Sequence, residues 1–468
     1  MDAREIVAAL SPASRVLVVG LGRSGMAAVR LLRKMGATVA VSEATPRERL
    51  DRENLAWLER HGVAVECGGH SQGLLSGADL VVVSPGVPLE LPLLRAAAEA
   101  GVPVLGEMAL ACGLVETPIV AITGTNGKST VTELVGEMFK AAGKRVFVGG
   151  NLGTPLSEYL LGEQDCEVLV LEVSSFQLDT APGFAPEVAV LLNISPDHLD
   201  RYRDYEAYCA SKFSLFAGQR HTAAAILNRD DRELMQRLGR YPVPARQFFY
   251  GGGSGGDGRG AEICGMEIVI GGLGAGEREK YSLAGTELGQ EPNIHNGAAA
   301  ILAARLLGCP SEAVRRALAG FRLLSHRLAL VAEIDGVQYF DDSKATNIGA
   351  VAAALQGMMQ PVVLIGGGRD KGGDYGLLHE LVRQRVKAMV LIGEAREKMA
   401  ASFSHLTKVV LAASLEEAVG EASRLAEPGD AVLLSPACAS FDMFSGYAQR
   451  GQVFREAVAA LAKDREAG

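Results

Sequence analysis

The feature that most constrains the fold lies at residues 118–139, where a strand signal, a glycine-rich loop and a helix signal follow one another. "PIVAITG" is an apolar run that ends in glycine, as a buried strand does. After the loop, apolar residues recur at helical spacing and give one continuous face, formed by Val131, Leu134, Val135, Met138 and Phe139. A strand that turns directly into a helix favours an α/β fold with a parallel sheet.

Strand and helix signals alternate along the rest of the chain as well. Strand signals run into polar or glycine-rich turns in each third, as in "RVLVVG", "EVLVLEVSSFQL" and "PVVLIGGGRDKGG". Such alternation is typical of doubly wound, mostly parallel sheets. The 468 residues allow roughly three domains of about 150 residues each. The segment "GGGSGGDGRG", residues 251–260, is predicted to be a mobile surface loop, with a functional lid as the alternative.

Composition and charge exclude several classes of protein. The net charge of −9 and the lack of a dense run of Lys and Arg disfavour a nucleic-acid partner. The seven cysteines include no CxxC pair, which favours free thiols in a reducing compartment. The N-terminus has acidic residues where a signal peptide needs basic ones, and no stretch reaches the roughly 18 apolar residues of a membrane span. We therefore expect a soluble cytoplasmic protein without membrane insertion.

The loop "GTNGKST", residues 124–130, is a shortened form of the Walker A phosphate-binding pattern. The full pattern requires glycine where this chain has Ile122. Glycines in the shortened loop would still let backbone N–H groups converge on phosphate oxygens at a helix N-terminus. Lys128 would reach the β- and γ-phosphates, and Ser129 or Thr130 would bind magnesium through a hydroxyl. The alternative is a plain strand–helix turn with a lysine in solvent.

A second glycine motif, "GLGRSG" at residues 20–25, also lies between a strand and a helix. With Glu43 at the end of the next strand it fits a dinucleotide-binding pattern, which makes a nicotinamide-dependent oxidoreductase one alternative function. The same geometry would suit the pyrophosphate of a nucleotide sugar, or would only make a tight turn.

Polar residues follow several strand signals, at the edge where α/β sheets bind ligands. Glu172 and His198 lie in the same third as the phosphate loop and are candidate magnesium ligands, although either alone would more often be an ordinary loop residue. Charged residues also cluster in the last third, which predicts anionic ligands although such clusters are often only solvated: His326, Arg327, Asp341, Asp342, Lys344 and Lys371.

Seven motifs together resemble those of the Mur ligase family, whose members add amino acids to the peptidoglycan precursor. They occur in order between about Val16 and Phe454: "GTNGKST", "EVSSFQL", "NISPDHLDRY", "HNGAAA", "SHR", "DDSKATN" and "LLSPACASFDMF". "DSKATN" and "SPACAS" are similar to the branch that adds D-glutamate. The resemblance implies three domains: a Rossmann-like UDP-substrate domain at 1–106, a central P-loop ATPase domain with a mostly parallel sheet at 107–323, and a Rossmann-like domain at 324–468 that binds D-glutamate and closes on ATP.

The resemblance also implies ATP and two magnesium ions, with manganese as a substitute. The ATP-binding residues would be Gly124, Thr125, Asn126, Gly127, Lys128, Ser129, Thr130, Asn293, Asn296, Arg327 and Asp342. The metal ligands would be Ser129, Glu172, His198 and Lys212, the last of them as a carbamate. The catalytic residues would be Lys128, His198, Lys212, Arg327 and Lys344. From the residues alone, Lys212 reads as an ordinary helix-surface lysine.

The partners implied are UDP-N-acetylmuramoyl-L-alanine and D-glutamate, joined by a monomeric enzyme through an acyl phosphate. The UDP-substrate would contact Arg23, Ser24, Ala44, Ser84, Gly86 and Asn151. D-Glutamate would contact Thr346, Lys371, Ser440, Phe441 and Tyr447, where Tyr447 replaces the phenylalanine of some relatives. The remaining alternatives are a ligase of the same family that adds a different amino acid or adds glutamate to folate, and a nucleotide-binding regulator without catalysis.

Overall fold

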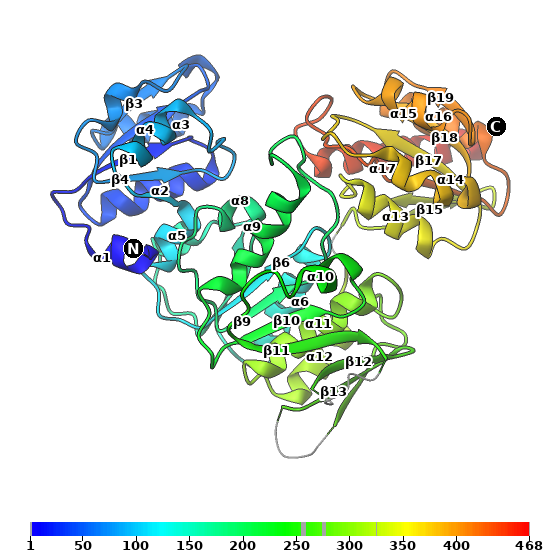
Figure 1. The fold of residues 1–468 in the computed structure, drawn as a ribbon. Helices are drawn as coiled ribbons and strands as arrows, with labels where there is room; N and C mark the ends of the chain where they lie inside the picture. Colours follow the sequence, from blue (N-terminus) through cyan, green and yellow to red (C-terminus); the bar gives the residue numbers. More distant parts are fainter. Residues whose placement is uncertain (1, 254–258, 274–277, 324, 468) are drawn as a thin grey trace. The chain divides into compact units, whose positions relative to one another are not determined.

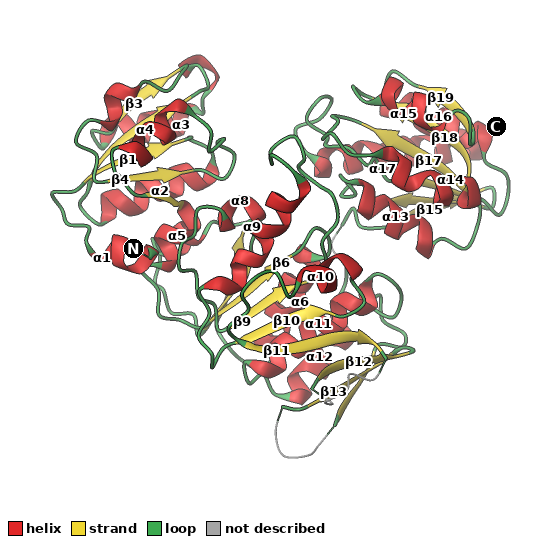
Figure 2. Ribbon diagram, viewed as in Figure 1, coloured by secondary structure: helices red, strands yellow, loops and turns green. Residues whose placement is uncertain are grey.

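A computed structural model describes residues 2–253, 259–273, 278–323 and 325–467 of the chain. Within these residues the strands form three sheets with helices beside them (Figures 1 and 2). Contacts divide the chain into two compact units. The first unit holds the first two sheets, and the second unit holds the third sheet together with residues 195–208 and 287–294. The predicted α/β fold with three mostly parallel sheets is confirmed.

The N-terminal sheet is parallel throughout, in the order β3-β2-β1-β4-β5. Its strands are β1 (Arg15–Val19), β2 (Thr38–Glu43), β3 (Ala64–Cys67), β4 (Leu80–Val83) and β5 (Val104–Gly106). The accompanying helices are α1 (Ala3–Ala8), α2 (Arg23–Lys34), α3 (Arg52–Arg60), α4 (Pro92–Glu99) and α5 (Glu107–Cys112). The first strand is the centre of a doubly wound sheet, so the turn after it lies where such sheets bind ligands.

The central sheet follows the order β14-β13-β12-β11-β10-β9-β6-β8-β7, and only the pairs β12–β13 and β13–β14 are antiparallel. Its strands are β6 (Ile119–Thr123), β7 (Val146–Gly150), β8 (Val168–Glu172), β9 (Val188–Leu191), β10 (Ala224–Asn228), β11 (Arg246–Gly252), β12 (Gly260–Cys264), β13 (Glu267–Gly271) and β14 (Glu279–Ser282). The helices are α6 (Lys128–Ala141), α7 (Leu156–Tyr159), α8 (Ser175–Leu178), α9 (Tyr205–Ala217), α10 (Arg232–Arg237), α11 (Asn293–Leu306) and α12 (Ser311–Gly320).

The glycine-rich segment 251–260 is only partly a loop. Gly251 and Gly252 belong to the end of β11, and Gly260 begins β12, which pairs parallel with β11. The expectation of a loop over all ten residues was therefore wrong at both ends, and residues 254–258 lie outside those described. Leu324, the start of the third domain expected from the sequence, also lies outside them.

The C-terminal sheet has the order β15-β16-β20-β17-β18-β19, in which only β15–β16 is antiparallel. Its strands are β15 (Ala329–Ile334), β16 (Val337–Asp341), β17 (Val362–Gly367), β18 (Val386–Ile392), β19 (Lys408–Leu411) and β20 (Ala431–Leu434). The helices are α13 (Ile348–Gly357), α14 (His379–Arg385), α15 (Arg396–Phe403), α16 (Leu415–Leu425) and α17 (Tyr447–Ala467). Two apolar cores cover the two faces of this sheet.

No helix among the described residues is both long enough and apolar enough to cross a bilayer.

Candidate functional site

The loop between β6 and α6 adopts a backbone that only glycine accommodates well. Gly124 has a φ of +155° and Gly127 a φ of +85°, in the region that side chains rarely enter. A Cβ added to Gly127 would lie 2.3 Å from Asn296 Oδ1 on α11. Gly127 is also the N-cap of α6, so the loop brings backbone N–H groups and the positive end of the helix dipole to one place.

Asn193, which the sequence analysis did not single out, fixes this loop from the end of β9. Its Oδ1 accepts from the Asn126 amide at 2.8 Å, and its Nδ2 donates to the Asn126 carbonyl at 3.0 Å. Its own carbonyl accepts from the Thr125 amide at 3.1 Å. Its sequence signals are its position two residues after a buried strand beside the phosphate-loop strand, and its place as the first residue of the motif "NISPDHLDRY".

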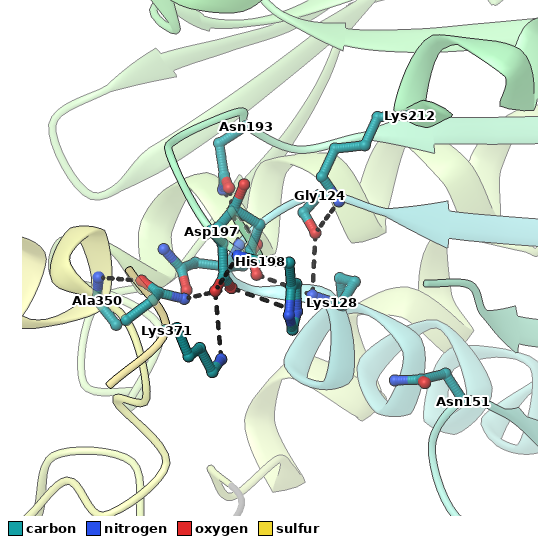
Figure 3. A network of polar contacts seen from close by, with 12 residues as sticks. Gly124, Lys128, Asn151, Asn193, Asp197, His198, Lys212, Ala350 and Lys371 are labelled. Atoms are coloured by element: carbon teal, nitrogen blue, oxygen red, sulfur yellow. Dashed lines mark hydrogen bonds and ion pairs between the residues drawn. The ribbon is translucent and has the colours of Figure 1, made fainter. Parts of the chain in front are cut away.

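Two predicted catalytic lysines reach the loop from different helices. Lys128 on α6 donates to the carbonyls of Gly124 at 2.9 Å and Thr125 at 2.8 Å, and Lys212 on α9 donates to Gly124 at 2.8 Å (Figure 3). Lys212 is only 2% exposed, so its reading as a helix-surface lysine was wrong. Lys128 is half-buried. A buried ammonium group with a second one close by suits an anionic ligand or a chemical change that removes the charge.

Glu172, at the end of β8, is 3% exposed and accepts from Asn151 Nδ2 at 2.6 Å. The backbone N–H of Asn151 also donates to the backbone carbonyl of Glu172 at 2.8 Å. Asn151, a predicted sugar contact, therefore also orients a predicted metal ligand. Ser129 and Thr130 are buried on the first turn of α6, and Thr130 Oγ1 has no hydrogen-bond partner among the described residues.

The carboxylate and hydroxyl oxygens of these residues fit magnesium chemically. Magnesium takes one or two carboxylates and completes its shell with water and phosphate oxygens, rather than using an all-protein cage. The described residues contain no cluster of three or more His, Cys, Asp and Glu side chains around one point. His198 belongs to the second unit, has a φ of +55° and lies beside Asp197, with 3.6 Å between Nε2 and Oδ2.

The "GLGRSG" motif makes a tight turn after β1. A Cβ on Gly25 would lie 1.9 Å from the Gly20 carbonyl, which also accepts from Ser84 Oγ at 2.9 Å. The Glu43 carboxylate accepts from the amides of Leu21 at 2.5 Å and Thr45 at 2.7 Å. Burial acts to raise the pKa of Glu43, but these hydrogen bonds outweigh it and lower the pKa. The Glu43 carboxylate therefore stabilises the backbone of this turn.

The other predicted UDP contacts surround this turn or lie across from it on the central domain. Arg23, the first residue of α2, donates to Thr154 Oγ1 at 3.4 Å and pairs with Glu158 at 3.5 Å. Ser24 is half-buried on the same helix, whereas Ala44 and Gly86 are exposed after β2 and β4.

Two of the predicted D-glutamate residues line one pocket of the second unit. Thr346 and Lys371 face it together with Asp197 and Asn347. The Asp197 carboxylate accepts from Lys371 Nζ and from Asn347 Nδ2, each at 3.2 Å (Figure 3). Lys371 therefore already binds a carboxylate in this structure, which is the chemistry expected of a glutamate site.

The other predicted residues of the second unit lie on loops or at the first residue of a helix. Ser440 is 2% exposed, whereas the Phe441 side chain is 65% exposed. Lys344 Nζ lies 5.0 Å from the centre of the Tyr447 ring. Asn293 begins α11, and Arg327 lies half-buried in the turn before β15.

Asp342, the predicted ribose contact, comes directly after β16 and is buried. It accepts from Ser435 Oγ at 2.9 Å and from the Leu328 amide at 3.2 Å. Burial raises the pKa of Asp342 to about 7, although the Ser435 hydrogen bond acts in the opposite direction. Its carboxyl group therefore changes charge near neutral pH.

Models of known protein families match segments of the chain that contribute strands to each of the three sheets. Three family models match: "Mur ligase MurD-like, N-terminal domain" at residues 14–106, "Mur ligase middle domain" at 122–260 and "Mur ligase, glutamate ligase domain" at 326–438. Among solved structures, a pseudomurein peptide ligase type C from Methanothermus fervidus aligns with a TM-score of 0.61 at 19% identity, over 96% of this chain and 100% of that one. A MurF ligase from Thermotoga maritima, solved with ADP, aligns with a TM-score of 0.57 at 19% identity, over 92% and 96%. These two share the fold.

Curated relatives are much more similar in sequence. The UDP-N-acetylmuramoylalanine--D-glutamate ligase of Syntrophotalea carbinolica is 44% identical over 95% of this chain and 97% of its own. The enzyme of the same name from Desulfosudis oleivorans is 45% identical over 96% of both chains. With identity at this level over nearly the full length and all three domains matched, the chain belongs to the Mur ligase family.

Proposed function

We propose that the chain joins D-glutamate to the L-alanyl carboxylate of UDP-N-acetylmuramoyl-L-alanine, with ATP converted to ADP and phosphate, in peptidoglycan precursor synthesis. The observation that carries the proposal is the 44–45% identity to ligases of that name over almost the whole of both chains. The glycine loop with the buried Lys212 and the half-buried Lys128 supports the ATP half, and the Lys371 pocket supports the glutamate half.

The chemistry follows from the weakness of a carboxylate as an acyl donor, because oxide is a poor leaving group. Transfer of the γ-phosphoryl group of ATP to the L-alanyl carboxylate gives an acyl phosphate and ADP. The amine of D-glutamate then attacks the carbonyl carbon, the tetrahedral intermediate expels phosphate, and the amine loses a proton. Lys128 and Arg327 would stabilise charge on the transferred group, and Lys344 would act on the bound glutamate.

Ser129, Glu172, His198 and a carbamylated Lys212 would hold two magnesium ions, or manganese in their place. When bound, these ions neutralise phosphate oxygens and hold them for in-line transfer. A carbamate would give Lys212 the charge and the paired oxygens of a carboxylate. Asn293, Asn296 and Asp342 would bind the adenosine part of ATP, and the remaining loop residues its phosphates.

The UDP moiety would lie along the turn after β1, near Arg23, Ser24, Ala44, Ser84 and Gly86, with Asn151 towards the sugar. The α- and γ-carboxylates of D-glutamate would engage Thr346, Lys371, Ser440, Tyr447 and the backbone at Phe441. We further propose domain boundaries at 106/107 and 323/324, a monomeric state and a cytoplasmic location.

One assay tests this function. Purified protein with UDP-N-acetylmuramoyl-L-alanine, ATP and magnesium is given D-glutamate, L-glutamate or another amino acid, and product mass and phosphate release are recorded. We expect an ATP-dependent product with D-glutamate only. A product with a different amino acid would assign another member of the family, and product without ATP would reject the acyl-phosphate route. Consumption of a nicotinamide cofactor would instead favour an oxidoreductase.

A further inference from the structure

Asp341, the last residue of β16, holds together three segments of the second unit. Its side chain is fully buried, and its Oδ2 accepts from His326 Nδ1 at 2.6 Å and from Arg455 Nε on α17 at 2.8 Å. Its Oδ1 accepts from the Ser343 amide at 3.1 Å. A buried carboxylate with three donors is strongly oriented, so the groups that bind it are fixed relative to the end of the sheet.

The His326 ring is confined on more than one side. Because Asp341 is an acceptor, the imidazole presents Nδ1–H to it. A Cβ added to Gly451 on α17 would lie 2.1 Å from His326 Nδ1, so the ring occupies space that only glycine leaves open. The Tyr447 ring packs against it edge-on, with ring centres 6.3 Å apart. The imidazole therefore has little freedom to turn.

The backbone on either side of Arg327 is left-handed. His326 has a φ of +65° and Leu328 a φ of +47°, and each such conformation is strained in a residue other than glycine. The turn is tied down at both ends by consecutive carboxylates. His326 binds Asp341 through its ring, and the Leu328 amide donates to Asp342 Oδ1 at 3.2 Å. Strain of this kind persists only where the surroundings over-determine it.

From this geometry we propose that Asp341 and His326 are positioning residues, which hold the strained turn that aims Arg327 at the γ-phosphate of ATP. The inference rests on the proposed role of Arg327. The same turn steadies a second predicted catalytic residue, because the His326 carbonyl accepts from the Lys344 amide at 3.1 Å.

A purely structural role for the buried ion pair predicts a different result. In that case its loss would lower the melting temperature and weaken all ligands alike. A positioning role predicts a selective loss, because Arg327 would touch a group that ATP has and ADP lacks. The ratio of the ADP dissociation constant to that of a non-hydrolysable ATP analogue separates the two.

The experiment measures both dissociation constants by calorimetry with magnesium and saturating UDP-N-acetylmuramoyl-L-alanine, without D-glutamate. Arg327→Ala is the reference, and we expect it to lower the ratio about tenfold or more, the effect typical of a lost charged contact. Asp341→Asn and His326→Asn should lower the ratio at least threefold. The dissociation constant for ADP should stay within twofold of the wild-type value. Asparagine tolerates left-handed backbone, so His326→Asn removes the ring with little change in backbone cost.

Gly451→Ala tests the same point without removing any functional group, and is used if Asp341→Asn does not fold. It should displace the ring and lower the ratio. Glu333→Gln changes an exposed carboxylate on β15 that accepts from Gln338 Nε2 at 3.2 Å; it is the matched control and should leave the ratio unchanged. If Arg327→Ala lowers the ratio but the Asp341, His326 and Gly451 variants keep the wild-type value, the positioning role is wrong. If Arg327→Ala itself keeps that value, the proposed phosphate contact fails, and the inference fails with it.

Discussion

Lys128 and Lys212 donate to the same oxygen, the carbonyl of Gly124, at 2.9 and 2.8 Å (Figure 3). One lysine comes from the helix that follows the loop and the other from α9, far along the chain. Two cations that converge on one carbonyl oxygen repel each other, and the repulsion is stronger away from water. The arrangement suits a site that gains negative charge when its ligands bind.

Replacement of Lys128 by alanine should lower kcat by about 10²–10³-fold, the usual cost of removing one group that stabilises developing charge. The fold should tolerate the change, because the Lys128 ammonium donates to carbonyls of its own loop, three and four residues away in the sequence. Phosphate release and melting temperature are measured together. Lys140→Ala, which changes an exposed lysine on the same helix, is the control and should retain full activity. A Lys128→Ala enzyme with near-normal turnover would contradict the proposed role.

Lys212 should carry a carbamate in the active enzyme. Incubation with ¹³C-bicarbonate should then give a carbamate carbon resonance that is missing in Lys212→Gln. Removal of carbon dioxide should slow the wild-type enzyme, and short carboxylic acids should partly restore Lys212→Ala by replacing the lost oxygens. A wild-type spectrum without the resonance, together with activity that does not respond to carbon dioxide, would leave Lys212 as a simple cation.

The sequence predicted those parts of the site that follow directly from a strand. Glu172, Asp342 and the 124–130 loop all come at the carboxyl end of a strand, as the alternation of apolar runs and polar turns indicated. Strand β3 carried no comparable signal, because Ala64–Cys67 is a sheet-edge segment with no fully buried residue.

Residues that depend on contacts between distant segments could not be predicted in this way. Lys212 looked exposed because helical periodicity does not reveal that a neighbouring loop covers it. Asn193 and His326 act through loops that meet only in the folded chain. For Lys212, the family resemblance supplied what the local pattern did not.

Asp342 should make the stability of the free enzyme depend on pH. Its pKa of about 7 in the folded protein lies above the ordinary value near 4, because burial penalises the charged form. The resulting stabilisation is complete below pH 4 and is lost as the pH rises through about 7. Three units of pKa correspond to at most about 4 kcal/mol. Denaturant unfolding at pH 5 and pH 8 should show a smaller difference for Asp342→Asn than for wild type. Asp335→Asn, which changes an exposed carboxylate after β15, should leave the difference unchanged.

Cys438 should resist alkylation although it lies beside the predicted glutamate site. It is fully buried, and burial raises the pKa of its thiol to about 11, so little thiolate exists at neutral pH. Cys264 is exposed and should react first. Peptide mass analysis after brief iodoacetamide treatment checks the order, and activity should survive modification of Cys264. Early labelling of Cys438 would show that this loop opens.

Gly127 and Gly143 offer a matched pair for testing the phosphate loop. Both have left-handed backbone, with φ of +85° and +77°, so alanine at either position should cost about 1 kcal/mol of stability. Only at Gly127 would the new Cβ meet a neighbour, Asn296 Oδ1 at 2.3 Å, whereas nothing lies within 4 Å at Gly143. Gly127→Ala should therefore weaken ATP binding at least tenfold, while Gly143→Ala should lower only the melting temperature. Equal ATP affinity in the two variants would mean that the loop shape is not what binds the nucleotide.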